Sequence, residues 1–182
     1  MEIPKPNPGW LKRQAAARAY QPKKVRLLLL GESPPSDERG FYIEGEASAE
    51  PLFAGVGAVL FEQPPSGSKT PFLKELRRRG IFVMDLKPDA PRHGEPLGDY
   101  VAPLIINLGT LSPEHVILVT PDVYEAAHAK LEKAGLAVVD VRVPAPGHET
   151  EFRQKLRQAL VRADLEKLIR PLPGPRKPPP AA

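Results

Sequence analysis

The side chains best suited to chemistry in this chain stand directly after short apolar runs. Glu32 and Ser33 follow the apolar run 25–30, and Asp85 follows the run 81–84. Carboxyl groups act as general acids and bases, and a hydroxyl beside a base acts as a nucleophile. Ser33 has neither a histidine partner nor the pattern of a nucleophile elbow, so we discard a serine hydrolase. The carboxyl groups therefore become the main candidates for chemistry.

Four short, nearly continuous apolar runs are typical of strands buried on both faces of a sheet. The runs are 25–30, 81–84, 116–119 and 137–141, and helical patterns alternate with them over 10–20, 51–61, 71–79, 97–108, 121–134 and 149–169. This alternation predicts a three-layer α/β/α fold around a central four-stranded parallel sheet. Since ligands bind outside the carboxyl ends of such strands, we expect one edge to carry Gly31, Asp85, Thr120 and Val143.

The ends of the helices carry recognisable signals. Thr70 and Thr120 stand where N-caps are expected, each followed by a proline in the first turn. Gly80 and Gly135 stand where helices stop. These signals support the boundaries given above.

Composition limits the kinds of site the chain can hold. The 182 residues fit one domain and include no cysteine, which excludes disulfides, thiolate metal sites, iron–sulfur clusters and cysteine nucleophiles. We expect no metal and no other cofactor. No signal peptide or membrane span is recognisable, so we expect a cytoplasmic protein, not bound to a membrane and monomeric. Abundant proline and arginine without cysteine also fit heat tolerance.

The two ends of the chain are basic and rich in proline, whereas the middle is acidic. Residues 1–26 carry seven Lys or Arg against one Glu. We divide the chain into a basic arm with a helix (1–24), a folded domain (25–169) and a basic tail (170–182). Any affinity for DNA is expected to be mainly electrostatic, resting on Lys12, Arg13, Arg18, Lys23 and Lys24 with help from Arg176 and Lys177. Plain solvated termini are the equally weighted alternative.

Short motifs in chain order resemble one known family. Gly31-Glu32-Ser33-Pro34-Pro35 resembles the Gly-Glu-Ala-Pro-Gly motif of the thermostable iron–sulfur branch of the uracil-DNA glycosylase superfamily. Gly40-Phe41-Tyr42 is similar to the segment whose aromatic ring stacks on the flipped base. Ile81 to Asp85 resembles the strand that ends in a base-reading Asn, and Val143 to Pro146 resembles the His-Pro-Ser-Pro loop. The resemblance covers roughly residues 25–160.

The resemblance implies an N-glycosylase that hydrolyses the bond between a flipped damaged base and its sugar in DNA. Glu32 matches the water-activating carboxylate, Phe41 is the better candidate for stacking, and Asp85 takes the place of the Asn. His148 is then the candidate donor to the departing base, with Ser33, Pro144 and Ala145 beside the base. The plainer interpretations are a turn-ordering Glu32, a core Phe41 and an N-capping His148.

Two departures keep other functions open. The missing cysteines rule out the cluster of that branch, and Val143 stands where its catalytic His is expected. A binding module for nucleic acid or nucleotides on the same fold, without turnover, is the alternative. An enzyme acting on small nucleotides is a third class, and it predicts no affinity for long DNA.

Replacing Asn by Asp85 bears on the choice of base. An Asn amide both donates and accepts hydrogen bonds, whereas an ionised Asp only accepts. An ionised Asp85 facing uracil O4 places a negative charge against a carbonyl oxygen, and neither group can donate a hydrogen bond. We therefore expect uracil to be a poor substrate. Pairing of Asp85 with Lys87 or Arg92, away from any base, is the alternative.

Overall fold

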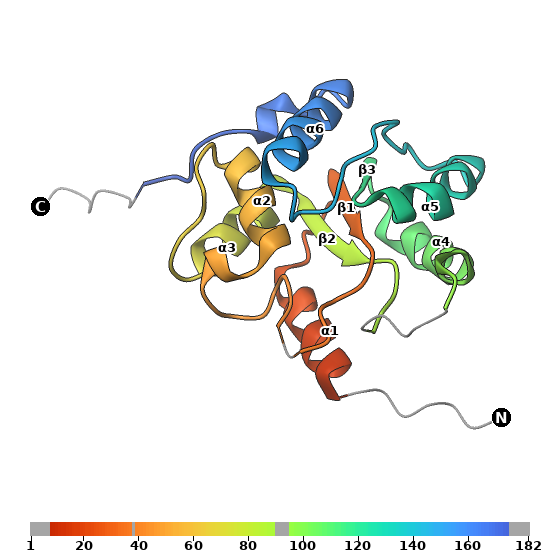
Figure 1. Ribbon diagram of the computed structural model, residues 1–182, viewed down its shortest axis with the longest axis horizontal. Helices are drawn as coiled ribbons and strands as arrows, with labels where there is room; N and C mark the ends of the chain where they lie inside the picture. Colours follow the sequence, from red (N-terminus) through yellow and green to blue (C-terminus); the bar gives the residue numbers. More distant parts are fainter. Residues whose placement is uncertain (1–7, 38, 90–94, 175–182) are drawn as a thin grey trace, which may run out of the picture.

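The computed structural model describes residues 8–37, 39–89 and 95–174, and its centre is a small parallel sheet (Figure 1). The strands are β1 (Leu27–Gly31), β2 (Ile81–Asp85) and β3 (His115–Leu118), in the order β2-β1-β3. Leu27 pairs with Ile81, and the register continues to Gly31 opposite Asp85. The predicted α/β class with a parallel sheet is therefore confirmed.

The predicted fourth strand is not part of this sheet. The segment 137–143 runs beside β3 and meets it through two isolated parallel bridges, Val116 to Val138 and Val119 to Val143. Between the bridges the segment folds on itself, because the Val141 N–H donates to the Val139 carbonyl rather than to β3. The sheet therefore has three strands rather than the expected four, with an irregular segment beside β3.

Helices cover both faces of the sheet. Figure 1 shows α2 and α3 on one side and α4 and α5 on the other, while α6 packs on α2. The α-helices are α1 (Pro8–Tyr20), α2 (Pro51–Leu60), α3 (Thr70–Arg79), α4 (Val101–Leu111), α5 (Pro121–Lys133) and α6 (Glu149–Arg162). Short 3₁₀ turns are η1 (Ala47–Ala49), η2 (Leu97–Tyr100) and η3 (Glu166–Leu168). No helix in the described ranges is long and apolar enough to cross a membrane.

Some helix boundaries differ from the prediction for local reasons. Thr120 caps α5 as expected, and Gly80 ends α3 in the left-handed region with φ 76°. Thr70 is not a cap, because its hydroxyl donates to Glu44 and Lys69 takes the N-cap position. The last helix stops at Arg162 rather than continuing to 169, since Asp164 has φ 55° and turns the chain.

Helix α1 is attached to the domain. Tyr20 stacks on Tyr42 at a centroid distance of 6.1 Å, and the carbonyl of Ala19 accepts a hydrogen bond from Arg77. Ala16 and Ala17 pack against the core. These contacts fix α1 at the end of the sheet toward which β2 points (Figure 1).

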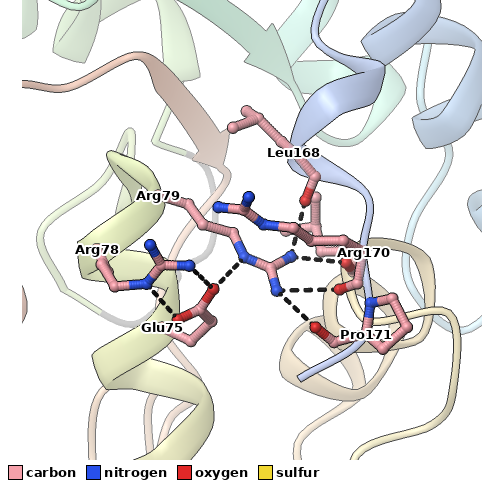
Figure 2. Close-up of polar contacts among 7 residues, drawn as sticks. Glu75, Arg78, Arg79, Leu168, Arg170 and Pro171 are labelled. Carbon is pink, nitrogen blue, oxygen red and sulfur yellow. Dashed lines mark hydrogen bonds and ion pairs between the residues drawn. The ribbon is translucent and has the colours of Figure 1, made fainter. Parts of the chain in front are cut away.

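Arg79, at the other end of β2, is a structural residue. Its side chain is buried and lies over the ring of Phe61. It donates to Glu75 and to the backbone carbonyls of Leu60, Leu168, Arg170 and Pro171. Figure 2 shows the guanidinium between Glu75 and the segment that follows α6. Arg79 therefore fastens the C-terminal segment to the domain and is not exposed to bind phosphate.

Candidate functional site

A cleft opens at the carboxyl edge of the sheet. The chain leaves β1 toward β2 and then returns across β1 to β3, and the point where strand order reverses is where such sheets bind ligands. The cleft has a volume of about 1430 Å³. Its wall contains the last residues of β1 and β2 and the residues directly after β1 and β3, namely Gly31, Glu32, Ser33, Asp85, Val119 and Thr120.

Glu32 and Asp85 are brought together here as the sequence predicts. Gly31 and Asp85 are register partners on adjacent strands, and Glu32 is the next residue after Gly31. A Cβ atom at position 31 would lie 2.9 Å from Oδ1 of Asp85, so the glycine leaves room for this carboxyl group. Within the described part of the chain, neither Glu32 nor Asp85 makes a hydrogen bond or ion pair through its side chain. Both carboxyl groups are thus open to a ligand.

Asp85 is the most perturbed of the acids that line the cleft. Burial, together with the negative charge of Glu50, raises the pKa of Asp85 to about 7, and the nearby charge of Arg13 opposes this rise. Near neutral pH a large share of Asp85 is therefore a neutral carboxylic acid, which both donates and accepts hydrogen bonds. A pKa raised this far runs against the expectation of a fully ionised Asp85.

Glu50, which lines the cleft, and Lys69, which bonds to the lining residue Gly40, were both missed from the sequence. Glu50 caps α2 by accepting from the backbone N–H groups of Leu52 and Phe53, and burial raises its pKa. Lys69 is 3% exposed, donates to the Gly40 carbonyl at 2.9 Å, and has its pKa lowered by burial. Pro51 at the first helical position was the only signal for this Glu50 cap.

The two aromatic residues divide their roles. Tyr42 is buried, and its hydroxyl accepts a hydrogen bond from the Val83 N–H at 2.8 Å. Phe41 is half-buried in the cleft wall and packs on Phe53 at a centroid distance of 4.9 Å. Lys69 also lies 3.4 Å from the Phe41 carbonyl and so holds this segment in place. Phe41 is therefore the ring that a flat ligand can meet.

The loop before α6 reaches the cleft differently from the prediction. Pro146 and Gly147 line the cleft, whereas Pro144 and Ala145 do not. His148 is exposed outside the lining residues and makes no side-chain capping bond. His148 thus occupies the N-cap position of α6, as the plainer interpretation expects, and it lies outside the residues that line the cleft.

Val143 is buried and bonded through its backbone to Thr120. No imidazole takes the position that the family resemblance would give to a histidine.

Two of the five basic residues assigned to nucleic acid lie at the cleft. Arg13 and Arg18 line it from α1. Lys12, Lys23 and Lys24 are not among the lining residues, and Lys24 pairs with Glu114 at 2.5 Å. Arg176 and Lys177 lie outside the described residues. The predicted basic surface is thus divided, with one part of it facing the cleft.

The alternative partners for Asp85 are not observed. Lys87 is buried and bonds to Glu95, with its ammonium over the ring of Tyr100. Arg92 and the weaker candidate His93 lie outside the described residues. Across 8–37, 39–89 and 95–174, no group of three or more His, Asp or Glu residues is arranged to hold a metal ion.

Comparison with models of protein families, with curated proteins and with solved structures found no match to this chain.

Proposed function

We propose that this protein is a DNA base N-glycosylase that holds one flipped nucleotide in the cleft at the carboxyl edge of the sheet. The observation that carries the proposal is the pair Glu32 and Asp85, which occupy neighbouring positions in one cleft without internal partners. Polar groups left unpaired in a concave site indicate a ligand. The motifs of the uracil-DNA glycosylase superfamily supply the chemical class.

Each side chain has one task in the reaction. Phe41 stacks on the flipped base, and Asp85 bonds to the base edge. Glu32 accepts a proton from a water molecule as the water oxygen attacks C1′ of the sugar. The C1′–N bond breaks with its electron pair passing to the base, and the base is then protonated. The products are the free base and an abasic site.

The proposal extends to the fold. The order β2-β1-β3 and the parallel bridges from β3 to 137–143 support a sheet related to the four-stranded one of the uracil-DNA glycosylase superfamily. In this view the segment 137–143 is a fourth strand that has become irregular. The domain of that type would run over 25–169, as the motifs indicate.

A non-catalytic module that binds nucleic acid or nucleotides is the second candidate. One observation favours it, namely that Val143 is buried and His148 lies outside the cleft, so neither position brings an imidazole to the departing base. The third class, an enzyme of small nucleotides, has no such observation in its favour. Turnover separates the first two candidates.

The test is a panel of labelled oligonucleotides, each with one damaged base, incubated with the protein and then with alkali. A glycosylase leaves an abasic site that alkali cleaves, and Glu32→Gln abolishes cleavage while the lesion is still bound. Glu62→Gln is the matched control because Glu62 is exposed outside the cleft lining. Binding of the panel without cleavage favours the binding module, and equal cleavage by Glu32→Gln contradicts the assignment.

A further inference from the structure

One side of helix α1 forms a continuous wall of the cleft. Its lining residues recur at helical spacing along most of the helix, and they are Trp10, Arg13, Gln14, Ala17 and Arg18, with Gln21 directly after the helix. From Trp10 to Arg18 the helix rises about 12 Å. The wall is therefore longer than a single base and lies at the end of the sheet toward which β2 points (Figure 1).

The cleft also has more room than a base requires. Its volume of about 1430 Å³ exceeds that of ordinary ligand pockets, which run to roughly 300–1,000 Å³. Helix α4 contributes another part of the wall, through Pro103, Asn107 and Thr110, which carry no charge. Space is thus left along α1 for chain on either side of a bound base.

Charge is distributed unevenly across the cleft. The acids Glu32, Glu50 and Asp85 lie around the ends of the strands. Of the cations in the wall, Arg13 and Arg18 lie on α1, whereas Lys87 is paired with Glu95 and Arg39 with Asp37. A polyanion is repelled from the first group and attracted to the second. A strand in the cleft is therefore oriented with its bases toward the sheet and its phosphates toward α1.

The side chains of this wall have unused capacity for binding. The side chain of Arg18 is exposed and has no hydrogen bond or ion pair with another described residue. The Nε of Arg13 is buried without a hydrogen-bond partner, and its guanidinium makes only long contacts, 3.7 Å to the Asp89 carboxylate and 3.5 Å to the Asp37 carbonyl. Trp10 is half-buried at the cleft, where its ring can stack on a base. An aromatic face beside cations is the arrangement that single-stranded nucleic acid binds.

We propose that the α1 wall, through Trp10, Arg13 and Arg18, binds single-stranded DNA that flanks the nucleotide held in the cleft. This inference rests on the proposed function for the identity of that nucleotide, but it concerns a separate surface. A stacked base beside Trp10 and phosphates beside the two guanidinium groups account for the length of the cleft. Lys12, Lys23 and Lys24 then contribute little.

The experiment uses the full chain and an unmodified DNA strand of about a dozen nucleotides. Trp10 is the only tryptophan, so its fluorescence reports on this wall alone. The single strand is expected to quench the fluorescence, and the matching duplex to bind at least tenfold more weakly. No quenching at saturation, or equal affinity for the duplex, overturns the inference.

Three variants locate the binding surface with a labelled strand followed by anisotropy. Trp10→Leu should weaken binding about tenfold through lost stacking. Arg18→Ala should weaken it severalfold and reduce the salt slope by about 0.7, as for one lost phosphate contact on a single strand. Lys23→Ala removes the same charge away from the cleft and should change neither. If Lys23→Ala matches Arg18→Ala, the binding is diffuse and the inference fails.

The two proposals can fail separately. The strands here carry no damaged base, so no glycosidic bond needs to break for the wall to be tested. Strand binding at Trp10 without base release contradicts the proposed function alone. Base release that is unaffected by Trp10→Leu and Arg18→Ala contradicts the α1 wall alone.

Discussion

Arg79 and Asp85 stand at opposite ends of β2 and show two ways of burying a charged group. Arg79 donates all five of its N–H groups in hydrogen bonds, one to Glu75 and four to backbone carbonyls (Figure 2). Asp85 has no such partner among the described residues and faces Glu50, a second acid. A buried charge whose hydrogen bonds are all made stabilises the fold. A buried charge without partners lowers stability and is typical of a site that binds a ligand.

The two ends also respond oppositely to pH. Hydrogen bonds from Arg78, with further bonds from Arg79, lower the pKa of Glu75 to about 2, so its contribution is complete above its ordinary range and is lost as pH falls. The pKa of Asp85 is raised to about 7. Its contribution is complete below about pH 4 and is lost as pH rises through 7, because the folded state then holds a buried carboxylate.

The largest expected effect on stability is at Arg79. Arg79→Met leaves Glu75 with one partner fewer and releases the carbonyls of the C-terminal segment, so unfolding should become easier by about 3–5 kcal/mol. Arg77→Met, at an exposed position of the same helix, should cost less than about 1 kcal/mol. Urea unfolding measures both. Equal destabilisation by the two variants would show that Arg79 does not anchor the C-terminal segment.

The next effect is at Asp85, where a substitution should raise the free energy of unfolding rather than lower it. Asp85→Asn removes a buried carboxylate whose ionised form lowers the stability of the fold. Each unit of pKa shift corresponds to about 1.4 kcal/mol. Because water reaches the cleft and screens this charge, we expect a gain of on the order of 2 kcal/mol at pH 8 and none at pH 4. Unfolding curves at pH 4, 6 and 8 measure it. A gain that is the same at every pH contradicts the account.

A smaller effect concerns the acid that faces Asp85. Glu50→Gln removes the negative charge but keeps an acceptor for the N-terminus of α2, so the titration of Asp85 should move to lower pH. Carboxyl NMR signals followed against pH, with Asp85 assigned through Asp85→Asn, measure the shift. Glu62→Gln, outside the cleft, should leave the titration unchanged. A titration of Asp85 that does not move would remove Glu50 from the site.

Signals local to the chain were readable from the sequence. Gly31, Glu32 and Asp85 follow apolar strands, and that position alone brings them to one edge of a parallel sheet. The sequence also separated Phe41 from the buried Tyr42 through alternation. Each of these predictions depends on a short-range pattern and on one topological rule.

What the sequence did not reveal depends on tertiary contacts. Glu50 in the cleft wall and Lys69 beside it are distinguished by their burial and by the charges around them. No spacing of residues in the sequence indicates either property. Arg79 looked like an ordinary helix end, because its acceptors at Leu168 and Arg170 are about 90 residues away in the chain. The predicted fourth strand became irregular over 137–143, although its apolar run resembles the others.

The central claim is that Asp85 forms hydrogen bonds with the edge of a base and that it does so as a neutral carboxylic acid. Single-turnover release of uracil from a labelled oligonucleotide, measured from pH 5.5 to 8.5, tests this most directly. For the parent we expect release to fall as pH rises through about 7, the pKa of Asp85. Asp85→Asn should match the parent at low pH, exceed it several-fold at pH 8, and show no step near pH 7. Identical profiles for the two proteins, or efficient release by the parent at pH 8.5, would contradict the account.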